Sequence, residues 1–125
     1  MINLRKLARG VIAASVLGLT GILAQTESAL AGSQRGIASY YSGYYQGRQT
    51  ASGVRFSNSS NMCAHKTLRF GTVVTVRNLR TGATARCRIA DRGPYVSGRV
   101  IDLSQSTFSQ IAPLSQGLVN VEISW

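Results

Sequence analysis

Apolar and polar residues alternate along three segments of this chain, residues 72–78, 84–90 and 118–124. A period of two is typical of β-strands that bury one face, so each segment is expected to be a strand. The five residues between the first two segments include Gly82, which favours a short hairpin. The second segment leads through Asp91 into an Arg-Gly-Pro turn.

The rest of the pattern adds shorter elements. Residues 36–41 resemble a first strand, and a second strand-like run carries Asp102. Ser104 is a predicted N-cap for a short helix that Pro113 ends. Residues 42–61 are rich in Gly, Ser, Asn and Gln, which predicts a long surface loop. Several short strands and one small helix indicate a small barrel, because closure removes exposed sheet edges.

The first 31 residues follow a different pattern. Basic residues precede an uncharged apolar run at 11–24, and Ala29-Leu30-Ala31 gives a small-x-small motif. This is the pattern of a secretory signal peptide cleaved after Ala31. The apolar run is shorter than the roughly 20 residues that span a bilayer, and Gly32 stands where a lipoprotein would have Cys. We therefore expect one domain at 32–125, exported to the periplasm or the cell exterior without a stable membrane anchor.

Cys63 and Cys87 are the two cysteines of the chain. In an oxidising compartment a disulfide between them is the default expectation. Two buried free thiols are the alternative. With one histidine in the chain, no structural zinc site is expected, and neither is a cofactor.

The formal net charge is +10, and arginine supplies most of it. Such a balance favours anionic partners. For an exported protein these are cell-wall polymer and anionic envelope surfaces. A nucleic acid is not expected, since no recognition motif accompanies the charge. Arg77, Arg86 and Arg88 are expected on the solvent face of the strands, as a solvated surface rather than as specific ligands.

Five stretches of the sequence, in order, resemble the rare lipoprotein A (RlpA)-like family. They are A-S-Y-Y-S-G-Y-Y-Q-G-R-Q-T-A-S-G (38–53), A-H-K-T-L-R-F-G-T (64–72), V-R-N-L-R-T-G (76–82), D-R-G-P-Y (91–95) and G-R-V-I-D-L-S (98–104). The resemblance implies a mainly β fold, a six-stranded double-psi β-barrel with one or two short helices. It also implies a groove lined by Asp91 and His65 and a substrate, the glycan strand of peptidoglycan.

Members of this family are lytic transglycosylases that cut glycan poor in stem peptides. The resemblance therefore implies an exported enzyme that cleaves MurNAc-β-1,4-GlcNAc bonds and leaves 1,6-anhydro-MurNAc ends. Asp91 and His65 are the expected catalytic residues, and the protein is expected to act as a monomer. The expected substrate-binding residues are Tyr41, Tyr45, Arg92 and Tyr95. The tyrosines at 40–45 admit two interpretations, a sugar-stacking face or a cover for the core.

One departure from the family pattern bears on catalysis. The family has a Glu directly after its T-A-x-G motif, and this chain has Val54. In lytic cleavage a single carboxyl can protonate the leaving oxygen and then accept a proton from the attacking hydroxyl, so Asp91 alone is expected to serve. Asp102, between Ile101 and Leu103, is expected to hold the barrel together. The alternative function is a non-catalytic peptidoglycan-binding or wall-loosening module.

Overall fold

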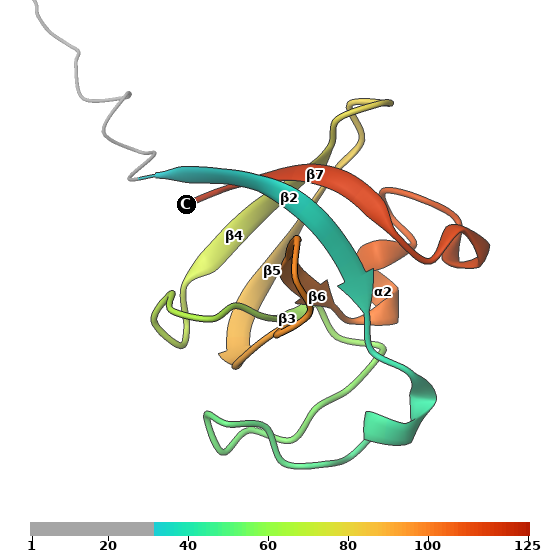
Figure 1. The fold of residues 1–125 in the computed structure, drawn as a ribbon. Helices are drawn as coiled ribbons and strands as arrows, with labels where there is room; N and C mark the ends of the chain where they lie inside the picture. Colours follow the sequence, from blue (N-terminus) through green and yellow to red (C-terminus); the bar gives the residue numbers. More distant parts are fainter. Residues whose placement is uncertain (1–31) are drawn as a thin grey trace, which may run out of the picture. The chain divides into compact units, whose positions relative to one another are not determined.

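The computed structural model describes residues 32–125, which form a closed six-stranded barrel (Figure 1). Its strands are β2 (Ser33–Tyr40), β3 (Met62–Ala64), β4 (Val73–Asn78), β5 (Thr84–Asp91), β6 (Arg99–Leu103) and β7 (Val119–Ser124). The same residues form one short helix, α2 (Gln105–Phe108), and two 3-10 turns, η2 (Gly43–Tyr45) and η3 (Leu114–Gln116). The predicted signal peptide at 1–31 lies outside the described residues and stays a prediction.

The strands follow each other around the barrel in the order β2-β6-β3-β5-β4-β7. The pairs β2–β6 and β3–β5 are parallel, and the other four pairs are antiparallel. This mixed closed sheet confirms the expected double-psi β-barrel. Because β3 and β7 stand three places apart in a ring of six, they lie on opposite sides of the barrel.

The predicted strands are present, with small shifts at their ends. The strand expected at 36–41 begins earlier, at Ser33, and those expected at 72–78, 84–90 and 118–124 lie within a residue of their observed bounds. The alternation did not single out β3, which has three residues and directly follows the polar loop. This short strand nonetheless lies between β5 and β6 in the sheet.

The barrel core is built from the apolar half of each alternating strand. In β4 and β5 the inward positions are fully buried, whereas Arg86 and Arg88 are exposed, as predicted. The largest buried apolar side chains are Phe108, Ile89, Ile101, Leu103, Ile123, Val74, Val76 and Val121. Phe108 comes from α2, so the short helix packs against the barrel and contributes an aromatic ring to its core.

Cys63 on β3 and Cys87 on β5 form the expected disulfide, with a Cα–Cα distance of 5.9 Å. Both residues belong to the buried core cluster. The bond links two strands that pair in parallel and that are separated by 24 residues in the sequence. It therefore ties the end of the long polar loop to the strand that carries Asp91.

The predicted hairpin and helix cap are also present. Gly82 has a φ of 82°, a left-handed conformation that glycine adopts without strain, and its N–H donates to the carbonyl of Asn78. At the start of α2, the Ser104 side chain accepts a hydrogen bond from the backbone N–H of Thr107. Within residues 32–125, no helix is long and apolar enough to cross a membrane.

Candidate active site

Four side chains lie in one row across the outer surface of the barrel. The register pairs Ser39 of β2 with Asp102 of β6, Asp102 with Ala64 of β3, and Ala64 with Asp91 of β5. Two strand spacings of about 4.8 Å separate the aspartates, so their Cα atoms lie about 10 Å apart. Ala64, which lies between them, is buried and packs with Tyr41 and Phe56.

A β-bulge brings Asp91 into this row. Cys63 pairs with Ile89, but the next residue, Ala64, pairs with Asp91, so Ala90 is an extra residue on β5. Strict alternation would direct Asp91 to the core face of Cys87 and Ile89. The bulge reverses the alternation and turns the carboxyl outward, a common use of bulges beside active sites.

Asp91 is held by hydrogen bonds to both of its carboxyl oxygens. The Tyr41 hydroxyl donates to Oδ2 at 2.5 Å, and the backbone N–H of Ala51 donates to Oδ1 at 2.9 Å. Burial, the hydrogen bond to Asp91 and nearby negative charge all raise the pKa of Tyr41, so the phenol stays protonated and remains a donor. The N–H of Ser52 donates to the carbonyl of Ala90, which fastens the 42–61 loop beside the bulge.

Asp102 has a different environment. It is largely buried, and the Ser39 hydroxyl donates to its Oδ1 at 3.2 Å. Burial raises the pKa of Asp102 to about 6, and the charge of Asp91 adds to the rise, against the opposing effects of the Ser39 hydrogen bond and the Arg99 charge. The expected structural hydrogen bond is present. The sequence did not predict that the pKa of Asp102 would lie near 6, or that Asp102 would share a row with Asp91.

Nothing local in the sequence distinguishes this Asp102 from a purely structural acid. Ile101 and Leu103 are buried on either side of it, as in any strand with one polar position. Its closeness to Asp91 depends on β3 lying between β5 and β6, and that strand pairing is set by the whole fold. The available signal was a carboxylate between two apolar residues of one strand.

The tyrosines divide between the two interpretations. Tyr40 packs on the core against Phe108, with ring centroids 4.8 Å apart. Tyr41 is buried under the loop and stacks on Phe56 at 4.3 Å. Tyr44 and Tyr45 are exposed by 66% and 44%. The last two are therefore available to a ligand, whereas Tyr41 acts on the site through Asp91.

The imidazole of His65 is buried and engaged at both nitrogens. Nδ1 accepts from the backbone N–H groups of Thr67 and Leu68, each at 3.1 Å, and Nε2 lies 2.8 Å from Oε1 of Gln34. Burial lowers the pKa of His65, with the Arg92 charge acting the same way. The imidazole is therefore neutral, with its proton on Nε2. Its Nδ1 holds the loop at 65–72 through the two backbone hydrogen bonds. The backbone N–H of His65 joins the site by donating to the Asp91 carbonyl.

Arg92 and Tyr95, two expected binding residues, have contrasting surroundings. Arg92 donates from Nη1 to the carbonyls of His65 and Leu68, and its guanidinium lies 4.0 Å from the centre of the Phe70 ring. The Arg92 side chain thus stabilises the 65–72 loop through these three contacts. Tyr95 is 75% exposed and follows the Gly93-Pro94 turn directly after Asp91. Its ring is therefore accessible to solvent.

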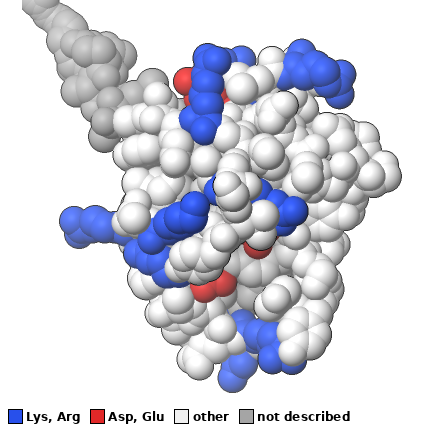
Figure 2. All heavy atoms as spheres, viewed as in Figure 1, with Lys and Arg blue, Asp and Glu red and all other residues white. Residues whose placement is uncertain are grey.

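A groove of about 490 Å³ is lined on one side by Arg88, Ile89 and Ala90 of β5, the three residues that precede Asp91. Its lining is mainly apolar and includes two exposed loop side chains, Val54 and Phe70. Arg88 contributes a positive charge at its edge. Figure 2 shows acidic atoms at two places near the middle of the face drawn, with Lys and Arg atoms around them.

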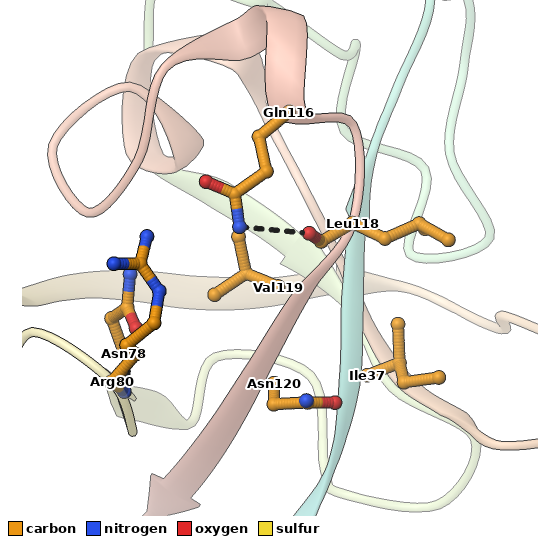
Figure 3. A pocket seen from close by; sticks show the side chains of 7 residues that line it. All are labelled: Ile37, Asn78, Arg80, Gln116, Leu118, Val119 and Asn120. Atoms are coloured by element: carbon orange, nitrogen blue, oxygen red, sulfur yellow. Dashed lines mark hydrogen bonds between the residues drawn. The ribbon is translucent and has the colours of Figure 1, made fainter.

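A second cavity, of about 210 Å³, lies between the ends of β4 and β7 and is lined by Ile37, Asn78, Arg80, Gln116, Leu118, Val119 and Asn120 (Figure 3). Gln116 donates across it to the Leu118 carbonyl, and no acid lines it. It lies on the β7 side of the barrel, away from β3 and the aspartate row. Among residues 32–125, His, Cys, Asp and Glu side chains nowhere gather in a group of three that could bind a metal ion.

The closed mixed barrel, with two carboxyls in one row on the face away from its core, belongs to the class of double-psi β-barrels. The family model described as lytic transglycolase matches residues 33–123. Together with the relatives below, this match shows that the chain belongs to the RlpA-like family of lytic transglycosylase domains.

Two curated relatives carry the name probable endolytic peptidoglycan transglycosylase RlpA. The protein from Aquifex aeolicus is 42% identical over 88 residues, which cover 70% of this chain and 39% of that protein. The Synechocystis protein is 49% identical over 88 residues, which cover 70% of this chain and 27% of that protein. The chain thus spans well under half the length of these relatives.

Among solved structures, the Streptomyces papain inhibitor is similar, with a TM-score of 0.61 and 27% identity. The match covers 76% of this chain and 94% of that one. A protein named for a different function therefore has the same barrel fold, so the function of this chain has to be inferred from its site.

Proposed function

We propose that this domain is a peptidoglycan lytic transglycosylase that cleaves MurNAc-β-1,4-GlcNAc bonds in peptide-poor glycan and leaves 1,6-anhydro-MurNAc ends. The observation that carries the proposal is the row of Asp91, Ala64 and Asp102, in which two carboxyls with different surroundings share one face of the sheet. The residue before Asp91, Ala90, lines an open groove. Membership of a family whose relatives are named for this activity supports the choice of reaction.

The reaction needs one proton donor and one centre of negative charge. The leaving oxygen of GlcNAc must be protonated as its bond to the muramyl C1 breaks, and positive charge develops at that carbon. The muramyl 6-hydroxyl then forms the new bond to C1 and gives up its proton. A carboxyl that donates first and accepts afterwards restores itself, so no water is consumed.

Asp102 suits the proton transfers. An acid with a pKa of about 6 is still partly protonated near neutral pH, and it becomes an adequate base once it has donated. Asp91 suits the electrostatic role, because donors fix both of its oxygens as acceptors on the same face. Two carboxyls whose environments differ in this way are the usual pattern of acid and stabiliser in glycan cleavage.

In this assignment the family Glu at the position of Val54 is not needed as the proton donor. Asp91, which was expected from the sequence to be the proton donor and acceptor, stays a catalytic residue in this assignment but takes another role, as the charge that faces the cation. His65 acts as a positioning residue, since its ring holds the loop whose backbone N–H donates to Asp91. Tyr45 and Tyr95 are exposed rings and would stack on sugar.

A non-catalytic glycan-binding module is the second candidate. The observation that favours it is the exposed Val54 in the groove wall, at the position where the family pattern described above has Glu. Such a module would use the same groove and exposed tyrosines without proton transfer. The two candidates differ in their products and not in where the glycan binds.

The test is digestion of peptide-stripped glycan strands with residues 32–125, followed by mass spectrometry of the products. The lytic enzyme yields anhydromuramyl ends, and Asp102→Asn and Asp91→Asn each remove them while glycan still binds. Glycan that binds without any new ends refutes the enzyme and supports the binding module. Full activity in Asp102→Asn refutes the assigned proton donor.

A further inference from the structure

We propose that Arg88 and the apolar groove beside Asp91 form a subsite for a muramyl residue whose lactyl carboxylate is free. This inference rests on the proposed function, because it assigns the sugar that occupies the groove next to the reacting bond. It gives Arg88 a specific ligand, where the sequence indicated only a solvated surface charge.

The groove has the size and lining of a sugar subsite. Its volume of about 490 Å³ falls within the range of roughly 300–1,000 Å³ that is typical of small-ligand sites. Val54, Met62 and Phe70 provide an apolar wall that suits an acetamido methyl group and the face of a sugar ring. Ser60 and Asn61 add polar groups at one side.

Val54 makes this wall particular to the present chain. Its side chain is 55% exposed and lines the groove. A carboxylate at this position would share the groove with Arg88 and would compete for its charge. With Val54 there, the guanidinium faces a groove without an acidic lining residue.

Arg88 is positioned for an anionic group. Its Nη1 donates to the Gly71 carbonyl at 2.9 Å, which fixes the guanidinium at the groove edge. The remaining N–H groups of the fork are available to a carboxylate, for which guanidinium geometry is well matched. Within residues 32–125 the ion pairs formed join Glu122 to Arg35 and Arg77, so Arg88 has no acidic partner in the described part of the chain.

A muramyl residue combines the two features of this subsite. It has an acetamido group and, on the 3-oxygen, a lactyl group that ends in a carboxylate when no stem peptide is attached. A stem peptide converts this carboxylate into a neutral amide and adds bulk. Recognition by Arg88 therefore gives a physical reason for a preference for peptide-poor strands.

The first arm of the test changes the ligand and leaves the groove intact. Peptide-stripped glycan strands are compared with the same strands after their carboxylates are converted to primary amides. Binding is measured in the Asp102→Asn background, so that cleavage does not affect it. Amidation is expected to weaken binding about tenfold, and equal affinity for the two glycans overturns the proposal.

The second arm changes the protein, with a matched control. In the same background, Arg88→Gln should bind the acidic glycan about tenfold more weakly and should no longer distinguish it from the amide. Arg86→Gln removes the same charge from an exposed position two residues away on β5, outside the groove lining. It should retain the parent's discrimination.

Loss of discrimination in both variants would show a general charge effect and overturn the subsite. Retained discrimination in Arg88→Gln does so as well. Arg88→Lys, which keeps the charge, should keep part of the discrimination, and this separates ligand recognition from a loop displaced by loss of the Gly71 hydrogen bond. Because binding is scored without turnover, these outcomes are independent of whether anhydro ends form in the digestion experiment.

Discussion

Replacing Asp102 by Asn should stabilise the protein at neutral pH. Burial raises the pKa of this carboxyl from 3.8 to about 6, so the folded state resists its ionisation. One pKa unit corresponds to about 1.4 kcal/mol, and the cost of the ionised form is therefore on the order of 3 kcal/mol. Asn is uncharged, and its side-chain oxygen can still accept the hydrogen bond from Ser39.

The pH dependence has a definite direction. An acid with a raised folded-state pKa costs nothing below the unfolded pKa, where both states are protonated, and costs most above the folded pKa. The advantage of Asp102→Asn should thus be near zero below pH 4, grow between pH 4 and 6, and level off above pH 6. Urea unfolding of both proteins with the disulfide intact, at pH 3.5 and pH 8, measures this difference.

Asp91→Asn is the matched control, because it lies in the same row with different surroundings. One Asn oxygen cannot replace two carboxylate oxygens that accept from Tyr41 and Ala51, so this variant should lose about 1 to 3 kcal/mol at pH 8. If Asp102→Asn is no more stable than the wild type at pH 8, or gains as much at pH 3.5, the assigned environment of Asp102 is wrong. If Asp102→Asn is more stable but inactive, Asp102 is a residue that lowers stability in exchange for activity.

Three further predictions concern the supports of the site. Replacing Cys63 and Cys87 by Ser should cost about 3 to 4 kcal/mol of unfolding free energy in urea melts, from the entropy of a loop of about 25 residues, and a cost below about 1 kcal/mol would contradict this. Tyr41→Phe removes a hydrogen bond to the Asp91 carboxylate, so it should lower the free energy of unfolding by about 1.5 to 3 kcal/mol and slow cleavage. In the same assays, replacing the exposed Tyr44 by Phe should change neither the stability nor the rate of cleavage. Since burial lowers the pKa of His65, protonation of this imidazole should cost the wild type stability as the pH falls below 6.5, against the opposite contribution of Asp102. The difference in unfolding free energy between the wild type and His65→Asn, whose oxygen can still accept from the 65–72 backbone, isolates the His65 contribution. The wild type should lose ground to this variant between pH 7.5 and pH 5, and a constant difference would contradict the neutral imidazole.

Local patterns in the sequence predicted much of the barrel. Alternation located three of the strands, and the Ser104 cap and Gly82 hairpin located the helix and the turn. These elements depend on interactions within a few residues. The disulfide was predicted from the compartment and the cysteine count, and the structure confirms it.

The composition of the site was harder to predict, because it depends on strand order and on one bulge. Asp91 could be selected from its motif, but its outward direction requires the extra residue Ala90 on β5. Asp102 joins the site through its pairing with Ala64 on a three-residue strand that alternation did not reveal. The engagement of His65 with Gln34, 31 residues earlier, has no sequence signal either.

The most direct test of the central claim uses water labelled with ¹⁸O. Peptide-stripped glycan is digested in this water by residues 32–125, and the new muramyl ends are examined by mass spectrometry. If Asp102 and Asp91 catalyse attack by the muramyl 6-hydroxyl, the new ends are 1,6-anhydro and carry no ¹⁸O, and Asp102→Asn forms none. Reducing ends labelled with ¹⁸O, or glycan that is bound but uncut, would contradict the account.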